Sequence, residues 1–312
     1  MPPRRAASHS KPCASVANTW AATRTLRAYA ACSGRQLSRN EELVETDLIY
    51  DVGAHQGEDT DFYLKKGFRV VGIEANATLH RLVSEKFAGH EQSGRLRLLN
   101  IAVAPADGPM TFYENETVSV WGTTSLDWVL RNEKRGTRSV ETVVQGRRFE
   151  NVLREYGVPY YLKIDIEGAD ILCVEALQRV ADKPKYVSLE SSITSWNGLL
   201  HEFSVLRELG YRWFKVVNQL EVMRQIPPNP ALEGRYVDYK FPDGSSGLFG
   251  EEAPGPWLTE DQALRKYRGI FLEYRLFGND GLFANFNWKR PLLWRFERLL
   301  PERKWHDTHA SL

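Results

Sequence analysis

Two groups of acidic residues follow short apolar runs and have the composition of a chemical site. The first is "DVGAHQG", residues 51–57, which comes directly after "LIY". The second is "LKIDIEGAD", residues 162–170, in which Asp165 and Glu167 close an apolar run. Carboxylates in such places attract a cationic ligand, hold a metal ion, act as a general base or cap the next helix. The neighbouring residues decide among these roles.

Small residues in the first group predict close contact with a ligand. Gly53 can take a positive φ and lets a ligand approach the backbone. Ala54 is the next smallest choice, and Gly57 permits close packing where a helix begins. Glu74 closes the next apolar run, 21 residues after Gly53, where a carboxylate can accept both hydrogen bonds from a ribose diol. The spacing therefore predicts an adenosine ribose.

The charges around this loop separate two adenosine cofactors. A dinucleotide site needs G-x-G-x-x-G, so that the pyrophosphate meets a helix N-terminus, and only Gly53 and Gly57 are present. Asp51 precedes the loop, and Glu58 and Asp59 follow it. These acids repel a pyrophosphate and attract the amino and sulfonium groups of S-adenosylmethionine. We therefore expect S-adenosylmethionine as the cofactor.

The second group predicts a base. Asp165 is expected at the carboxyl end of a strand and Glu167 in the loop after it, both facing the cleft of the first group. Lys163 would share a strand face with Asp165 and keep the carboxylate ionised. We prefer Asp165, before Glu167, as the base that deprotonates a hydroxyl. Glu190 could join them as a metal ligand, and Glu167 could instead cap a helix, but we predict no metal site.

Strand and helix patterns alternate from residue 47 onward. Strands are expected at 47–52, 68–75, 95–104, 108–115, 139–145, 160–165, 185–191 and 211–218, and helices at 58–66, 76–87, 149–156, 169–180, 199–209 and 259–277. This alternation predicts an α/β fold, with a mostly parallel sheet and helices on both faces. Residues 226–257 are too rich in Pro and Gly for a regular element and are expected to form a lid loop. Trp121, Trp196 and Tyr236 are candidate walls of the acceptor site.

Composition sets the domain organisation. The chain has 312 residues, 42 % of them apolar, and a net charge of +1, which gives no general attraction to nucleic acid. Residues 1–39 contain seven Arg or Lys and no acid, so we expect a disordered basic extension. Residues 40–225 are expected to form the cofactor-binding domain, and residues 226–312 a C-terminal lid loop and helices packed on it.

The sequence has little that indicates a membrane span or a disulfide framework. No run of about 18 apolar residues is present, so no transmembrane segment is expected. The three cysteines form no disulfide framework, and a cytoplasmic protein is predicted. The tail 288–304 contains "PLLWRFERLL", whose apolar residues form one helical stripe beside two arginines. This stripe would pack on its own domain or contact a membrane surface.

Four motifs in this order resemble the FkbM family of methyltransferases. They are "DVGAHQG", "VVGIEAN", "NIAVA" and "YLKIDIEGAD", and the resemblance covers about residues 46–220. It implies a Rossmann-like class I methyltransferase fold with a C-terminal extension. It also implies O-methylation by S-adenosylmethionine of a hydroxyl on a sugar, glycolipid or polyketide-like molecule.

The resemblance also implies roles for single residues. The implied cofactor contacts are Asp51, Gly53, Glu74 and Ala102, and we add the loop residues Ala54, His55 and Gly57. Asp165 and Glu167 are implied to line the site. Family loops often carry Asn where this chain has His55. The His55 side chain would be a cofactor contact or a base.

The sequence leaves two other functions open. A nicotinamide-dependent oxidoreductase would bind NADH, although the missing middle glycine and Asp51 argue against it. A non-catalytic methyltransferase-like module would bind S-adenosylmethionine without turnover, or would not bind it. Intact Asp51, Glu74 and Asp165 favour the enzyme.

Overall fold

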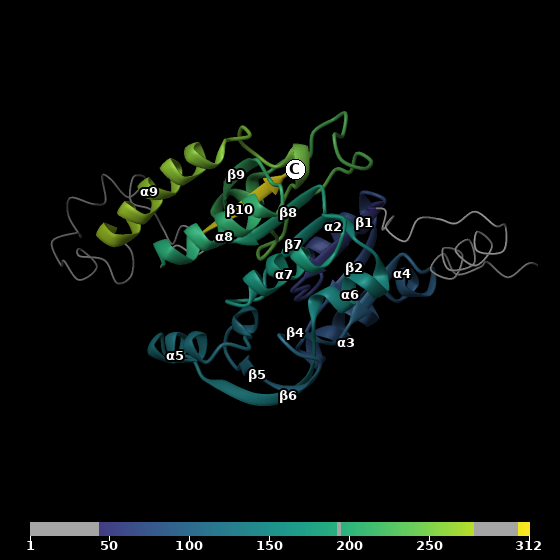
Figure 1. Ribbon diagram of the computed structural model, residues 1–312. Coiled ribbons are helices and arrows are strands. Elements are labelled where there is room, and N and C mark those ends of the chain that lie inside the picture. Colours follow the sequence, from purple (N-terminus) through teal and green to yellow (C-terminus); the bar gives the residue numbers. More distant parts are fainter. Residues whose placement is uncertain (1–43, 192–194, 278–304) are drawn as a thin grey trace, which may run out of the picture. The chain divides into compact units, whose positions relative to one another are not determined.

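A seven-stranded sheet carries the predicted alternation of strands and helices (Figure 1). The computed structural model describes residues 44–191, 195–277 and 305–312, all within the unit Asn40–Leu312. The strand order is β3-β2-β1-β7-β8-β10-β9. The strands are β1 (Glu45–Val52), β2 (Arg69–Ile73), β3 (Leu96–Leu99), β7 (Pro159–Ile164), β8 (Tyr186–Glu190), β9 (Trp213–Asn218) and β10 (His306–Ser311).

Helices follow most of these strands, as the sequence predicts. They are α2 (Glu58–Lys65), α3 (Ala77–Lys86), α4 (Ala88–Gln92), α6 (Phe149–Tyr156), α7 (Asp170–Ala176), α8 (Trp196–Glu208) and α9 (Glu260–Phe277), with 3-10 turns η2 (Leu177–Arg179), η3 (Gln219–Arg224) and η4 (Gly250–Glu252). Asn76 caps α3, because its side chain accepts hydrogen bonds from the backbone N–H groups of Thr78 and Leu79.

The strand order reverses beside β1, and this reversal places the site. β1 pairs in parallel with β2 on one side and with β7 on the other. In open α/β sheets a ligand crevice forms outside the carboxyl ends of the two strands at such a switch point. The ends of β1 and β7 carry "DVGAHQG" and "DIEG", so both acidic groups of the sequence meet there.

Each face of the sheet buries its own set of side chains, because neighbouring residues of a strand point to opposite faces. Ile49 joins an apolar cluster with Phe62 of α2 and Phe249. Tyr50 points the other way, where its hydroxyl donates to the carbonyl of Gly157 at 2.9 Å and its ring packs edge-on against Phe149. Helices therefore cover both faces, as predicted.

The Pro/Gly-rich segment, residues 226–257, is here called the strap. Its residues Phe241, Leu248 and Phe249 belong to the apolar cluster beneath α2. The ring of Phe249 stacks on that of Tyr161, with centroids 4.6 Å apart. Residues 245–250 of the strap are thus buried against the domain, and residues 243–246 reach the cavity described below.

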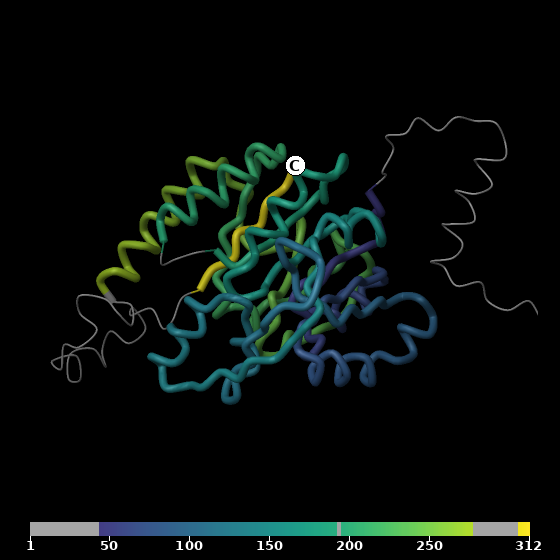
Figure 2. The backbone as a smooth tube through the Cα atoms, turned by 60° about the horizontal axis from the view of Figure 1, so that its bottom comes forward, coloured from purple at the N-terminus to yellow at the C-terminus, as the bar shows by residue number. Residues whose placement is uncertain are grey.

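The strand β10 was not predicted from the sequence. It pairs antiparallel with both β8 and β9 and runs among the strands of the sheet, drawn in yellow in Figure 2. The segment "HDTHAS" is polar, so no apolar period marks it as a buried strand. Hydrogen bonds compensate for its burial: the hydroxyl of Thr308 lies 2.5 Å from that of Ser191 and 2.7 Å from that of Tyr267.

A second, three-stranded sheet has the order β4-β6-β5. Its strands are β4 (Ala102–Val103), β5 (Gly108–Asn115) and β6 (Ser139–Arg147), and η1 (Ser119–Trp121) and α5 (Leu126–Lys134) lie between β5 and β6. The sequence predicted strands at 108–115 and 139–145 but not the helix α5. Residues 116–138, here called the insertion, bring aromatic and basic side chains to the site.

No helix within the described residues combines the length and the apolar character needed to cross a bilayer. The basic extension 1–39, the tail 288–304 and two of the three cysteines lie outside the described residues. Cys173 is buried on α7.

A buried ion pair ties the strap to α2, and neighbouring lysines allow a matched test of it. Nζ of Lys66 lies 2.8 Å from a carboxylate oxygen of Glu252, and both side chains are fully buried. We expect Lys66→Met to lower the free energy of unfolding by about 3–5 kcal/mol, because it leaves Glu252 buried without its partner. Lys65→Met removes an exposed pair with Asp61 and should cost less than about 1 kcal/mol. Chemical denaturation measures both; equal losses would contradict this account.

Candidate functional site

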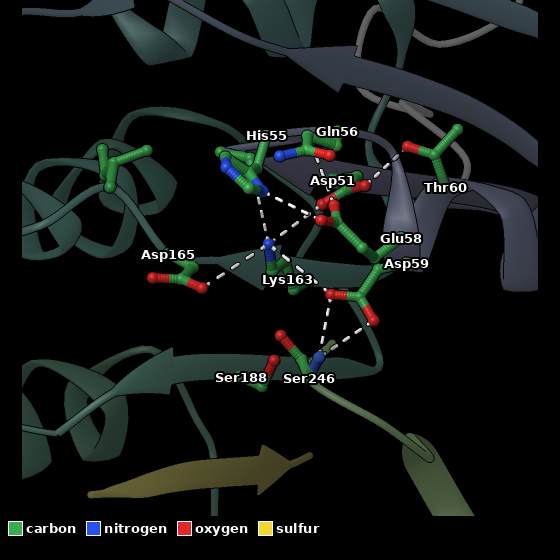
Figure 3. Close-up of polar contacts among 12 residues, drawn as sticks. Asp51, His55, Gln56, Glu58, Asp59, Thr60, Lys163, Asp165, Ser188 and Ser246 are labelled. Carbon is green, nitrogen blue, oxygen red and sulfur yellow. Dashed lines mark hydrogen bonds and ion pairs between the residues drawn. The ribbon is translucent and has the colours of Figure 1, made fainter. Parts of the chain in front are cut away.

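Lys163 of β7 stands at the centre of the site (Figure 3). Its Nζ lies 3.1 Å from Oδ1 of Asp51, 3.7 Å from Oδ2 of Asp59 and 3.8 Å from Oδ2 of Asp165. It also donates a hydrogen bond to the carbonyl of Gly53 at 2.9 Å. Lys163, Asp51 and Asp59 are buried, whereas the side chain of Asp165 is 44 % exposed. One cation thus connects the ends of β1, β7 and the start of α2.

The charges of this group depend on one another. Burial alone would lower the pKa of Lys163, but the surrounding carboxylates, led by Asp51, raise it overall, so the ammonium stays charged. Burial raises the pKa of Asp59 to about 7, against the attraction of Lys163. Asp51 also accepts a hydrogen bond from the Thr60 hydroxyl at 2.6 Å. Asp51 therefore links β7 and α2 beneath the loop of residues 53–57, through Lys163 and Thr60.

Close approach of the two strand ends explains the glycine at position 53. Gly53 has a φ of 87°, and a Cβ there would lie 1.9 Å from the carbonyl oxygen of Asp165. Gly57 has a φ of 75°, and its Cβ would lie 2.6 Å from the ring of Phe87. The first glycine lets the loops of β1 and β7 touch, and the second lets α2 begin against α3.

His55 is held at both ring nitrogens. Nδ1 lies 2.9 Å from Oε1 of Glu58, and Nε2 lies 2.8 Å from the hydroxyl of Ser119. Its φ of 47° is unusual for a residue with a side chain, and such strain collects at functional sites. Because neither nitrogen points freely into the cleft, this geometry favours a contact or positioning role over that of a base.

Glu74 lies just after β2 with its carboxylate at the cleft. One oxygen accepts the backbone N–H of Asn76 and the other that of His55, both at 2.8 Å. The residue is 8 % exposed, and burial raises its pKa to about 7 although the two N–H groups oppose the shift. Each oxygen has a further lone pair, so the carboxylate can still accept a diol.

A cavity of about 960 Å³ connects these residues. Seven of the nine predicted site residues line it: Gly53, Ala54, His55, Glu74, Ala102, Asp165 and Glu167. Asp51 and Gly57 lie behind the cavity wall and contact other protein groups. Of the three candidate wall aromatics, Trp121 lines the cavity, whereas Trp196 and Tyr236 do not.

Glu167 lies opposite the insertion. Its φ is 49°, and its carboxylate oxygen Oε2 is 3.8 Å from a guanidinium nitrogen of Arg131. Burial, followed by repulsion from Glu190 and Asp165, raises the pKa of Glu167 well above its usual range. Gly168 lies against Trp128, whose Nε1 would be 2.2 Å from a Cβ there. Side chains of α5 therefore contact both Glu167 and Gly168 in the loop after β7.

Several cavity residues were missed by the sequence analysis. Trp128 and Arg131 lie on α5, with the guanidinium 3.4 Å from the centre of the indole ring. Their spacing of three residues on a helix was the available signal. Asp307 of β10 and Ser246 of the strap also line the cavity; no local pattern marks either of them.

The donor set fits a cationic adenosine derivative better than a metal ion. No group of three or more His, Cys, Asp or Glu residues within the described ranges is arranged to hold a metal. Glu74 offers paired acceptors, Gly53 brings the backbone to the cavity wall, and Glu58 and Asp59 are acids that line the cavity. These features match a ribose diol, an adenosine body and positive groups respectively.

The solved structures that match this chain include several methyltransferases. A precorrin-6y C5,15-methyltransferase from Geobacter metallireducens is 13 % identical, with a TM-score of 0.34, over 62 % of this chain and 74 % of that one. An O-methyltransferase from Bacillus cereus in complex with SAH is 12 % identical, with a TM-score of 0.32, over 64 % and 83 %. Phosphoethanolamine N-methyltransferase 2 from Haemonchus contortus is 11 % identical, with a TM-score of 0.31, over 88 % and 50 %.

A family match covers the site. No relative was found among curated proteins. Residues 51–213 match the family described as the methyltransferase FkbM domain. The matched segment is more than half of the chain and contains every predicted cofactor-binding and catalytic residue.

Two glycines with the same backbone conformation allow a test of the contact between the strand ends. Gly53 and Gly255 have φ values of 87° and 88°, but a Cβ at Gly255 meets nothing within 4 Å. Gly255→Ala should cost about 1–2 kcal/mol of stability, from the left-handed backbone alone. Gly53→Ala should cost at least about 2 kcal/mol more, because Cβ collides with a carbonyl. Thermal and chemical denaturation compare them; equal costs would refute the contact.

Proposed function

We propose that this chain, which belongs to the FkbM methyltransferase family, methylates a hydroxyl group. The chain is a methyltransferase, and its cofactor is S-adenosylmethionine. The position of the Asp165 carboxylate is the observation that supports a hydroxyl as the methyl acceptor. The carboxylate is half-exposed at the cavity, beside Gly53, and Lys163 lies 3.8 Å behind it. A fixed carboxylate there can take the proton of an incoming hydroxyl.

The cofactor-binding half of the site is proposed to comprise Gly53, Glu74 and Ala102, which follow or belong to β1, β2 and β4. Glu74 would accept the ribose hydroxyls, and Gly53 would let the cofactor lie against the backbone. Ala102 gives an apolar floor near the adenine. Asp51 contributes indirectly, because with Lys163 it holds the carbonyl of Gly53 in place.

S-adenosylmethionine supplies a methyl group on a sulfonium whose departure gives a neutral thioether. The main task of the protein is therefore to align the acceptor oxygen with the methyl group. Such positioning contributes about 7–11 kcal/mol in favourable cases. The cavity of about 960 Å³ is at the upper end of the range of about 300–1,000 Å³ for small-molecule sites, which leaves room for an acceptor beside the cofactor.

Asp165 is the proposed base, with Glu167 as the second candidate. Removal of the hydroxyl proton by a positioned carboxylate contributes about 10²–10⁴-fold. The neighbouring ammonium of Lys163, 3.8 Å away, fixes the direction of the Asp165 carboxylate. Glu167 has a raised pKa, which makes it a stronger proton acceptor once it is ionised, but it is ionised in fewer molecules at neutral pH.

The acceptor is proposed to be a polyhydroxylated molecule, such as a sugar, a glycolipid headgroup or a polyketide. Trp121 and Trp128 line the cavity together with several acids, and the guanidinium of Arg131 lies over the ring of Trp128. Rings of this kind stack on sugar faces, while carboxylates accept hydrogen bonds from hydroxyls. We also propose that the protein acts in the cytoplasm.

The pKa of Glu74 makes cofactor affinity depend on pH. A ribose diol donates to the ionised carboxylate, so affinity is present above pH 7 and lost as the pH falls through the pKa of about 7. We expect the dissociation constant of S-adenosylhomocysteine to rise about tenfold between pH 8 and pH 6. Glu74→Gln should bind weakly at both values. Calorimetry measures this; a wild-type dependence retained in Glu74→Gln would rule out this role.

Asp165→Asn tests the base. We expect S-adenosylhomocysteine affinity to stay within about twofold and kcat to fall at least tenfold, because the amide cannot accept the proton. Formation of S-adenosylhomocysteine with a panel of sugar and polyketide alcohols is the assay, and Asp261→Asn, an exposed aspartate on α9, is the matched control. Unchanged kcat in Asp165→Asn would clear this residue of the role.

A further inference from the structure

Three carboxylates form a row across β7, β8 and β10, here called the acid row: Asp165, Glu190 and Asp307. Asp307 pairs directly with Glu190, and Ile164 pairs with Leu189, so Asp165 and Glu190 come next on neighbouring strands. Residues opposite each other in a sheet point to the same face, with Cβ atoms about 4.5–5.5 Å apart. All three line the cavity.

Within the described residues no cation forms an ion pair with Glu190 or Asp307, although Arg131 attracts Glu190 and Lys163 attracts Asp307 from farther away. Lys163 makes its closest contacts with Asp51 and the carbonyl of Gly53, and lies 3.8 Å from Asp165. Asp307 is only 8 % exposed, yet no hydrogen bond or ion pair joins its carboxylate to any of the described residues. A buried carboxylate normally has such a partner.

The pKa values of Glu190 and Asp307 agree with the lack of an ion-pair partner. Burial, with repulsion from Asp165, raises the pKa of Glu190 to about 8. Burial, with repulsion from Asp165 and Glu190, raises the pKa of Asp307 well above its usual range. Like charges opposite each other in a sheet are destabilising, and a positive charge placed between them would reverse this effect.

The position of the row separates it from the cofactor. The proposed cofactor contacts follow or belong to β1, β2 and β4, whereas the acid row is on the strands beyond the switch point, β7, β8 and β10. A positive group bound at the row would therefore belong to the acceptor. Asp165, the proposed base, is the member of the row nearest to β1.

We propose that the acceptor carries a protonated amine beside the hydroxyl that is methylated, as an amino sugar does, and that Glu190 and Asp307 bind this ammonium. The inference rests on the proposed function, because it names the substrate class of the same site. Held as an ammonium, the nitrogen has no lone pair and is not methylated. The hydroxyl oxygen attacks the methyl carbon, the carbon–sulfur bond breaks, and the hydroxyl proton passes to Asp165.

Calorimetry on the full chain saturated with S-adenosylhomocysteine tests the inference without turnover. The probes are glucosamine with N-acetylglucosamine and galactosamine with N-acetylgalactosamine, at pH 7.5 and low salt. We expect the amine to bind at least tenfold more tightly than its neutral twin in at least one pair. Equal affinities in both pairs, or no binding of either amine, would overturn the inference.

Isosteric variants locate the binding. Asp307→Asn and Glu190→Gln should each weaken amine binding at least tenfold and leave affinity for S-adenosylhomocysteine unchanged, which also reports folding. Glu85→Gln changes the charge equally at an exposed position of α3 and should have no effect. An amine preference that survives both cavity variants would overturn the assignment.

The two proposals fail in different ways. Methyl transfer to hydroxyls with no preference for amines would overturn the inference and leave the proposed function intact. A preference for amines that both variants abolish, with no transfer to any hydroxyl, would support the ammonium site and overturn the proposed reaction. Mass spectrometry of the products distinguishes methyl on oxygen from methyl on nitrogen; methyl on the nitrogen would overturn the inference.

Discussion

One buried ammonium, that of Lys163, determines how the two halves of this site meet. Without it, Asp51 and Asp59 would be two buried carboxylates that repel each other with no cation nearby, an arrangement that costs several kcal/mol. With it, β1, β7 and α2 are fixed around a shared charge, and the carbonyl of Gly53 points at the same atom. The only exposed member of the group is Asp165. A structural ion cluster thus presents one carboxylate to the cavity in a defined direction.

The close approach of the ends of β1 and β7 constrains the backbone around them. β1 and β7 meet so tightly that only a glycine fits at position 53. The loop residues that follow, His55 and Glu167, are the two non-glycine residues with positive φ within the described ranges. Contacts from the insertion hold both: Ser119 bonds the His55 ring, and the Thr123 hydroxyl donates to the carbonyl of Glu167. The insertion is therefore part of the site and not an appendage to it.

The sequence predicted those parts of the protein whose signal is local. Apolar runs ending in Gly53 and in "DIEG" predicted the parallel strands, and the acids around them predicted the place of the site. The strand β10 escaped because its residues are polar, and side-chain hydrogen bonds such as that between Thr308 and Ser191 replace apolar burial. The partners of the loop after β7 escaped for another reason: Arg131 reaches Glu167, and Trp128 reaches Gly168, only through the fold of the insertion.

The cavity is electrostatically uneven. On the cofactor side, Glu74 is bound by two N–H groups and Asp51 by Lys163 and Thr60, so the negative charge there is largely compensated within the protein. On the far side, Glu190 and Asp307 face each other across two paired strands. A sheet register that opposes two carboxylates is unfavourable in an empty protein and becomes favourable when a cation binds. The carboxyl groups that lack an ion-pair partner therefore lie where the acceptor is proposed to bind, and the register that would favour a cation there raises their pKa values in the free protein.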